Sequence, residues 1–286
     1  MKEKALLIGR RRAIVGVVTE PDPTSKNSTA TAVLLLNAGM IHHAGPGRIY
    51  VKLARRLAQS GVSSVRFDLS GVGDSPVRSD HLPVVMAAIQ EPREVMDDLQ
   101  KMGFKRFILA GLCSGAYCAF RTALEDERVS GMALINTMSL KGELEMASRV
   151  WEQRYLKTSI YSRQAWKNLL TGKVQYTRLM KAIASKLNPF NRMGSSKKMD
   201  ETLVEEIRLL TGRGQKIFFL CAEKDISVQY LQVVLAGELQ GFIASGMVEQ
   251  EILPGANHLF TKHDHQEQMI NLASSWIVQE ANSSGD

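Results

Sequence analysis

The chain has 286 residues, 44% of them hydrophobic, which fits one large globular α/β domain or a domain with an insertion. Its three cysteines are too few for a disulfide framework, so we expect a reducing compartment. No apolar run reaches the ~18 residues of a membrane span, and the apolar stretch 5–8 is shorter than the ~7–15 residues of a signal-peptide core. These features predict a cytoplasmic protein with no membrane span.

The net charge of +7 is concentrated in one segment of the chain. Residues 138–200 hold thirteen basic and four acidic residues, a net charge of +9, whereas the rest of the chain carries −2. Such a segment forms either a solvated lysine-rich surface or a docking surface for an acidic partner or anionic substrate. Nucleic acid is disfavoured as a partner, because no zinc, helix-turn-helix or RNA-binding motif accompanies the charge.

Hydrophobic patterning predicts strands and helices in alternation. The chain begins with a hairpin that turns around Gly9, followed by a polar loop over 21–31. The further elements expected are strand 33–37, helix 48–59, strand 62–68, helix 91–102, strand 104–110, helix 114–124, strand 129–136, strand 216–222, helix 228–239, strand 248–253 and helix 265–280. This order predicts a mostly parallel central sheet with helices on both faces.

One segment interrupts the alternation. Residues 139–187 have helical periodicity and no clear strand, and we expect residues 138–211 to form a helical cap inserted between two core parts, 1–137 and 212–286. The aromatic residues Trp151, Tyr155 and Trp166 are expected to pack inside this cap rather than bind a ligand.

The most informative motif is the run 111–115, GLCSG, which lies between a predicted strand and a predicted helix. A strand, a tight turn with glycines two residues either side of a nucleophile, and a helix form a nucleophile elbow. The central residue is Cys113. Ser114 is displaced by one position, and one of its own flanking residues would be the bulky Leu112. Cys113 is therefore the candidate nucleophile, and the alternative is an inert residue in a degenerate elbow.

A nucleophilic cysteine needs a base, and the base needs an orienting acid. Asp225 and His258 each follow one of the last two predicted strands. Because loops that leave the carboxyl ends of parallel strands gather at one edge of a sheet, these residues are expected to meet Cys113 there. Glu223 and Asp74 are the alternative acids, and a surface histidine is the alternative for His258.

The order nucleophile, acid, histidine and the elbow together resemble the α/β-hydrolase superfamily over almost the whole chain. The chain is similar in particular to bacterial hydrolases with a serine-aminopeptidase-like core. The run 66–75, RFDLSGVGDS, resembles that family's D-x-R-G-x-G-x-S loop, with Ser70 where arginine is usual. The resemblance implies an α/β-hydrolase fold with a helical cap.

The same resemblance implies how an oxyanion would be held. The run 37–40, NAGM, falls where the family has His-Gly-x-x and where a backbone N–H forms half of the oxyanion hole. Because Asn37 replaces the histidine, the loop donor is either Gly39 or Met40. It would be paired with the N–H of Ser114, the residue after the nucleophile.

Two adjacent histidines, His42 and His43, begin the run 42–48, HHAGPGR. This run and the Gly-Leu-Cys elbow look like hydrolases found beside bacterial exopolysaccharide-export genes. A metal pair is disfavoured, because adjacent side chains are expected to point apart and no carboxylate-rich partner is near. We expect the two histidines to contact substrate or to form an ordinary loop, and we expect no metal and no cofactor.

Cysteine in place of serine changes the expected chemistry. A free thiol has a pKa of ~8.5, and a neighbouring histidine lowers it through a thiolate–imidazolium pair. The acyl intermediate is then a thioester, which passes its acyl group readily to another thiol or to an amine, so cysteine suits acyl transfer or the hydrolysis of activated esters and thioesters. The sequence predicts an ester or thioester hydrolase with a Cys113–His258–Asp225 triad and a small acyl substrate. The alternatives are an acyltransferase with an acidic carrier protein docked on the basic cap, and a non-catalytic binding protein.

Overall fold

The computed structural model describes residues 1–10, 12–22, 30–80, 82–137, 140, 193–235 and 237–283. The chain divides into two compact units, Met1–Lys141 with Val204–Asp286, and Gly142–Leu203. Most of the second unit lies outside the described residues. The expected cap, its aromatic residues and its basic surface fall there and stay predictions, as do the domain boundaries.

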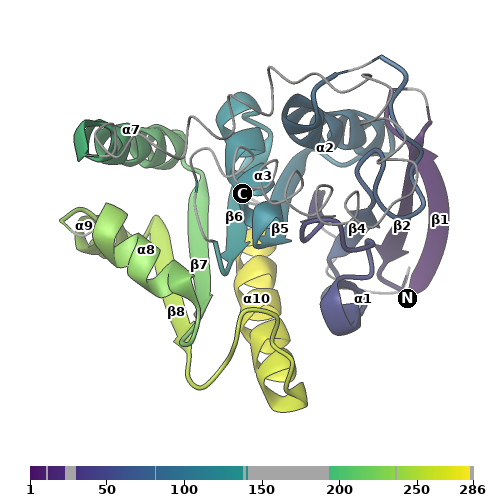
Figure 1. Ribbon diagram of the computed structural model, residues 1–286. Coiled ribbons are helices and arrows are strands. Elements are labelled where there is room, and N and C mark those ends of the chain that lie inside the picture. Colours follow the sequence, from purple (N-terminus) through teal and green to yellow (C-terminus); the bar gives the residue numbers. More distant parts are fainter. Residues whose placement is uncertain are drawn as a thin grey trace, which may run out of the picture. The chain divides into compact units, whose positions relative to one another are not determined.

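The described strands form one eight-stranded sheet with the order β1-β2-β4-β3-β5-β6-β7-β8 (Figure 1). They are β1 (Lys2–Ile8), β2 (Ile14–Glu20), β3 (Thr31–Leu36), β4 (Ser63–Phe67), β5 (Arg106–Leu112), β6 (Val129–Ile135), β7 (Lys216–Ala222) and β8 (Val248–Leu253). The pairs β1–β2 and β2–β4 are antiparallel, and all other neighbours are parallel. The N-terminal hairpin and the mostly parallel sheet expected from the sequence are confirmed.

The described helices are η1 (Pro46–Arg48), α1 (Ile49–Gln59), α2 (Val84–Lys101), α3 (Ser114–Glu125), α7 (Met193–Gly212), α8 (Ile226–Val234), α9 (Leu239–Ala244) and α10 (His263–Ser283). Two sequence predictions are corrected. The helix expected over 91–102 begins at Val84 and continues through Pro92, because buried residues before the proline hold its first turns in place. The helix expected over 228–239 is two helices, and Gly237, a poor helix former, lies in the break.

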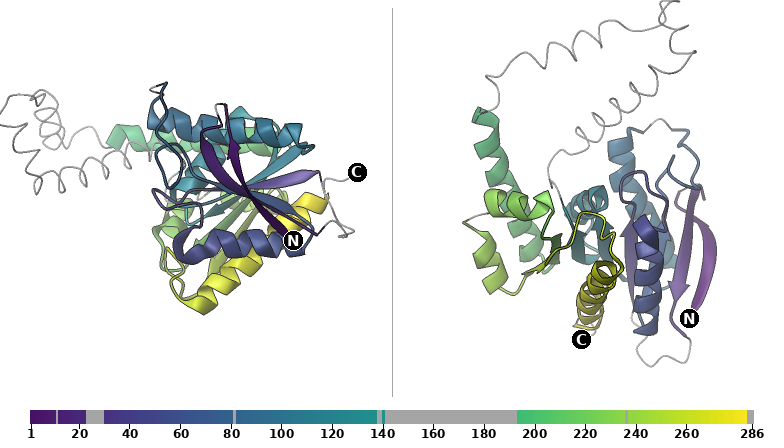
Figure 2. Two further views of the ribbon diagram at one scale, coloured as in Figure 1. Left: turned by 90° about the vertical axis from the view of Figure 1, so that its right-hand side faces the viewer. Right: turned by 60° about the horizontal axis from the view of Figure 1, so that its bottom comes forward.

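Helices cover both faces of the sheet. Figure 2 shows α1 and α10 packed side by side on one face and α2 with α3 on the other. The central strands β3 and β5 are buried over almost their whole length, as their unbroken apolar runs require. Because β3 to β8 run parallel to one another, the loops that follow them leave the sheet at one edge. Within the described part, every helix is too short or too polar to cross a lipid bilayer.

Candidate active site

Cys113 occupies a strained turn between β5 and α3. Its backbone has φ 59° and ψ −117°, a conformation that a non-glycine residue adopts only when its surroundings enforce it. A Cβ on Gly111 would collide with the backbone of Gly115. A Cβ on Gly115 would lie 2.6 Å from the carbonyl oxygen of Leu36 and 2.8 Å from that of Asn37. The two flanking glycines therefore let α3 approach both β5 and β3, as expected for an elbow.

Backbone hydrogen bonds fix the elbow from two sides. The N–H of Cys113 donates to the carbonyl of Ile135 in β6 at 2.9 Å. The N–H of Leu112 donates to the hydroxyl oxygen of Tyr50 on α1, also at 2.9 Å. Tyr50 is fully buried, and burial raises the pKa of its hydroxyl, which stays protonated. The turn that carries Cys113 is thus held by both the sheet and α1.

His258 connects Asp225 to Cys113. Its Nδ1 lies 2.5 Å from Oδ2 of Asp225, and its side chain is also hydrogen-bonded to the Cys113 thiol. The bond to Asp225, followed by the bond to Cys113, raises the pKa of His258 to about 10 against the opposing effect of burial. Burial opposes ionisation of Asp225, but bonds from His258 and Ser227 outweigh it and lower the pKa of Asp225. The structure therefore brings the expected cysteine, histidine and acid together.

The alternative acids contact other groups. Glu223 accepts the N–H of Gly255 at 2.7 Å, and Asp74 lies 3.0 Å from Nε2 of His42. Of the three candidate acids, Asp225 is the one that the structure places on His258.

The other two cysteines are core residues, as expected. Cys118 in α3 and Cys221 in β7 are buried, and neither forms a disulfide. Burial raises the pKa of Cys118 to about 12 and that of Cys221 to about 11. Cys113 is the only one of the three that is partly exposed.

The two segments expected to form the oxyanion hole, the loop after β3 and the start of α3, are joined by the side chain of Ser114. The N–H of Gly39 donates to Oγ of Ser114 at 2.7 Å. Gly39 has φ 61° and lies in a tight turn closed by the N–H of Ile41 on the carbonyl of Ala38 at 3.1 Å. The side chain of Met40 is exposed. The sequence did not reveal the role of the Ser114 hydroxyl, because its partner lies 75 positions away.

Asn37 anchors the loop that follows β3. Its Nδ2 donates to Oδ1 of Asp68 and to the carbonyl of Ile41, both at 2.9 Å, and its Oδ1 accepts the N–H of Leu69 at 2.8 Å. Every polar atom of this buried amide has a partner. The asparagine that replaces the family's histidine therefore connects the loops after β3 and β4.

The two histidines of the same loop form a cluster with two carboxylates. Their rings are 3.8 Å apart, His43 Nδ1 lies 2.7 Å from Asp68, and His42 Nε2 lies 3.0 Å from Asp74. The expectations that these side chains point apart and that no carboxylate is near are wrong, because the loops after β3 and β4 are adjacent in space. The cluster is a candidate metal site, since its four ligand atoms lie within 4.8 Å of one another.

Hydrogen bonds already engage the atoms of this cluster. The N–H of Ala44 donates to Nδ1 of His42 at 3.2 Å, so the proton of a neutral His42 ring is on Nε2 and faces Asp74. Asp68 is fully buried and also accepts the backbone N–H groups of His43 and Asp74. The described contacts assign the cluster the role of joining two loops at the edge of the sheet.

Asn136 is a further site residue that sequence reasoning missed. It is fully buried at the end of β6, with φ 46°. Its Oδ1 accepts the N–H of Ala222 at 2.6 Å, and its Nδ2 donates to the carbonyl of His258 at 2.8 Å. Asn136 thus connects β7 to the loop that carries the histidine. The available signal was a polar residue directly after an apolar strand, which was assigned to the strand itself.

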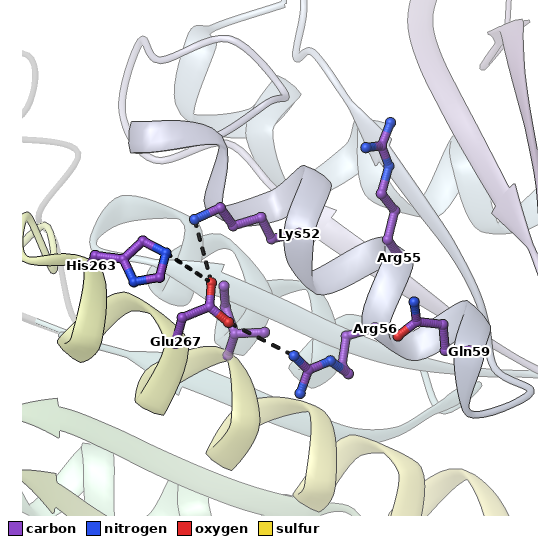
Figure 3. A pocket seen from close by; sticks show the side chains of 7 residues that line it. Lys52, Arg55, Arg56, Gln59, His263 and Glu267 are labelled. Atoms are coloured by element: carbon purple, nitrogen blue, oxygen red, sulfur yellow. Dashed lines mark hydrogen bonds and ion pairs between the residues drawn. The ribbon is translucent and has the colours of Figure 1, made fainter.

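A separate hollow of about 290 Å³ lies between α1 and α10 (Figure 3). It is lined by Lys52, Arg55, Arg56, Gln59, His263, Glu267 and Ile270. Glu267 lies 3.4 Å from Lys52 and 3.8 Å from Arg56, so its carboxylate offsets part of the positive charge. The residues that line this hollow come from the helices and not from the loops around Cys113.

The chain matches a family model described as the alpha/beta hydrolase fold over residues 40–260. It resembles the solved structure of an alpha-beta serine hydrolase homologue from Coxiella burnetii, with 15% identity, a TM-score of 0.56, and 97% and 98% of the two chains covered. It also resembles a proline iminopeptidase from Mycobacterium smegmatis (14% identity, TM-score 0.56, coverage 99% and 100%). A dienelactone hydrolase from Anabaena variabilis is similar at 13% identity, with a TM-score of 0.53 and 97% of each chain covered. No curated protein matches the chain.

Proposed function

The chain belongs to the α/β-hydrolase family, and from this premise we propose that it hydrolyses acyl esters or thioesters through an acyl intermediate on Cys113. The observation that carries the proposal is the position of His258, hydrogen-bonded to Asp225 on one side and to the Cys113 thiol on the other. A nucleophile, a base and an orienting acid linked in this order are the requirement for nucleophilic catalysis.

In the first half-reaction the Cys113 thiolate attacks the carbonyl carbon, and a C–S bond forms as the carbonyl oxygen becomes an oxyanion. The imidazolium of His258 then gives its proton to the departing oxygen or sulfur, and the bond to that atom breaks. In the second half-reaction His258 takes a proton from water, the hydroxide attacks the thioester, and the thiolate leaves. Asp225 holds Nδ1 of His258 throughout and stabilises the positive charge whenever the ring is protonated.

Exposed apolar side chains support an acyl group as substrate. The loops that carry the site residues expose Met40 by 47%, Ile41 by 36% and Leu259 by 38%, and Ile226 at the start of α8 is exposed by 56%. Each lies within two residues of Gly39, Asp225 or His258 in the sequence. Exposed apolar side chains next to the reacting residues in the sequence favour a substrate with a hydrocarbon portion.

The test is incubation with a panel of acyl thioesters followed by intact-mass measurement. The wild-type protein is expected to gain the mass of one acyl group during turnover, and peptide mapping is expected to place it on Cys113. Cys113→Ala should carry no adduct, whereas the matched control Cys118→Ala, which alters a buried thiol of the same helix region, should retain it. Wild-type protein that neither forms an adduct nor releases acid from any substrate would indicate the non-catalytic alternative.

Acyl transfer is the second candidate function. The observation that favours it is the net charge of +9 over residues 138–200, which suits an acidic carrier protein. The two functions differ in the second substrate, because hydrolysis uses water and transfer uses an acceptor thiol or amine. An acyl adduct that persists in water and is discharged by an added thiol acceptor would favour transfer.

We also propose a cytoplasmic location, which the three free thiols support.

A further inference from the structure

The backbone N–H of Gly39, one of the groups expected to donate to the oxyanion, is hydrogen-bonded to the side chain of Ser114. The N–H of Gly39 donates to Oγ of Ser114 at 2.7 Å, a short and well-formed hydrogen bond. An N–H that already has an acceptor does not point freely at a developing oxyanion. The loop after β3 therefore presents its donor to the elbow residue rather than directly to the site.

A hydroxyl group that accepts a hydrogen bond still has a proton to donate. Ser114 Oγ uses a lone pair for Gly39, and its O–H remains able to rotate toward a new acceptor. In addition, donation from Gly39 polarises the hydroxyl and makes it a better donor, since hydrogen bonds in a chain strengthen one another. The backbone N–H of Ser114 is the first of α3 and has no acceptor within its own helix.

We infer that Ser114 supplies two donors to the oxyanion, its backbone N–H and its side-chain O–H, the latter supported by the N–H of Gly39. In this arrangement the hydroxyl transmits the interaction of the loop to the reacting oxygen. The inference rests on the proposed function, because it assumes that an acyl group reacts at Cys113. It assigns Ser114 a catalytic role in stabilising the oxyanion and not a role as nucleophile.

Two other interpretations of the same contact make opposite predictions. If the hydroxyl blocks the hole, the substrate must displace it, and its removal should accelerate acylation. If Ser114 is itself the nucleophile, the wild type should be acylated on Ser114 and not on Cys113. Removal of the Ser114 hydroxyl should then abolish acylation. The structure argues against Ser114 as the nucleophile, because the strained turn is centred on Cys113 and the side chain bonded to His258 is that of Cys113. The blocking interpretation is decided by experiment.

The experiment compares two reactions of the same thiol. Acylation by p-nitrophenyl acetate passes through an oxyanion, whereas alkylation by iodoacetamide displaces iodide and forms none. For Ser114→Ala we expect the acylation rate to fall by about 100-fold, the usual effect of losing one oxyanion donor, with the alkylation rate within about twofold of wild type. Ser114→Thr, which keeps a hydroxyl, should recover much of the acylation rate. Ser274→Ala, which removes a buried hydroxyl on α10, is the matched control and should change neither rate.

Peptide mapping of the acetylated wild type decides which residue is the nucleophile, and an acetyl group on Ser114 would overturn the inference. Acylation of Ser114→Ala at the wild-type rate, or faster, would overturn the inference and favour the blocking interpretation. An equal loss of acylation and alkylation would also overturn it, because it would show that the hydroxyl positions the thiol. Wild-type protein that is alkylated but never acylated would instead refute the proposed function.

Discussion

The three thiols of the chain lie in different surroundings. Cys113 is partly exposed and bonded to His258, whereas Cys118 and Cys221 are buried and have pKa values raised to about 12 and about 11. Since the thiolate is the reactive form, iodoacetamide at neutral pH should label Cys113 first. Peptide mapping after brief exposure measures the order of labelling. Faster labelling of Cys118 or Cys221 would argue against Cys113 as the nucleophile.

The bond between Asp225 and His258 makes stability depend on pH. The pKa of His258 is raised from 6.5 to about 10, so its contribution to the free energy of unfolding is complete below about pH 6.5 and falls as pH rises toward 10. The pKa of Asp225 is lowered, so its contribution is lost only in acid. We therefore expect the free energy of unfolding of the wild type, measured by urea titration, to exceed that of Asp225→Asn by the largest amount near pH 6. The difference should shrink toward pH 10.

A stability difference that stays constant across this range would contradict the assignment of the pKa shift to this pair.

The Asp225→Asn variant should also lose turnover, though less than His258→Ala, because the acid orients the base whereas the base moves protons in both half-reactions. His263→Ala, which removes an exposed histidine of α10, provides the control for loss of an imidazole.

Sequence reasoning predicted which candidate residues the topology brings together, and it missed residues whose position depends on long-range hydrogen bonds. Cys113, Asp225 and His258 could be identified because each follows a parallel strand, and such loops gather at one edge of a sheet. The bonds Asn37–Asp68 and Asn136–His258 join positions 31 and 122 residues apart. No local pattern marks an amide whose partners are this distant in the chain.

At the level of whole elements, the approach of α3 to the sheet depends on Gly115. An added Cβ would meet two backbone carbonyl oxygens, of Leu36 and Asn37, which cannot rotate away as a side chain can. We expect Gly115→Ala to lower the free energy of unfolding by about 1–3 kcal/mol, measured by urea titration. Gly212→Ala is the control, because a Cβ there meets nothing within 4 Å and α7 should be unchanged or slightly more stable. Equal stability of the two variants would refute the packing argument.

Element boundaries were predicted well where patterning and local chemistry agreed. The strands β7 and β8 were predicted with their observed bounds, because an apolar run and its flanking turn residues coincide. The start of α2 was misjudged because proline favours the first turn of a helix, whereas Pro92 lies well inside α2. The break between α8 and α9 was missed because the apolar run continues across it and hides the turn at Gly237.

For the molecule as a whole, the sheet and its helices followed from the alternation of predicted elements, and the family model agrees with them over residues 40–260.

The unequal distribution of charge along the chain has a consequence for binding partners. The described core carries the candidate site, while the excess of basic residues lies in the segment 138–200. A substrate that needs only the core should therefore be insensitive to that charge, whereas an acidic carrier protein should depend on it.

Salt dependence tests this difference. Electrostatic steering weakens with salt, because the Debye length falls from ~10 Å at 0.1 M to ~3 Å at 1 M. We expect kcat/KM for a carrier-bound acyl thioester to fall across a salt series and kcat/KM for a short neutral ester to stay constant. Replacing Lys167, Lys173 and Arg178 by glutamate should depress only the first, because electrostatic steering does not act on an uncharged ester. Equal salt sensitivity for both substrates, or none for either, would show that the basic segment is a solvated surface and would remove the support for a carrier-protein partner.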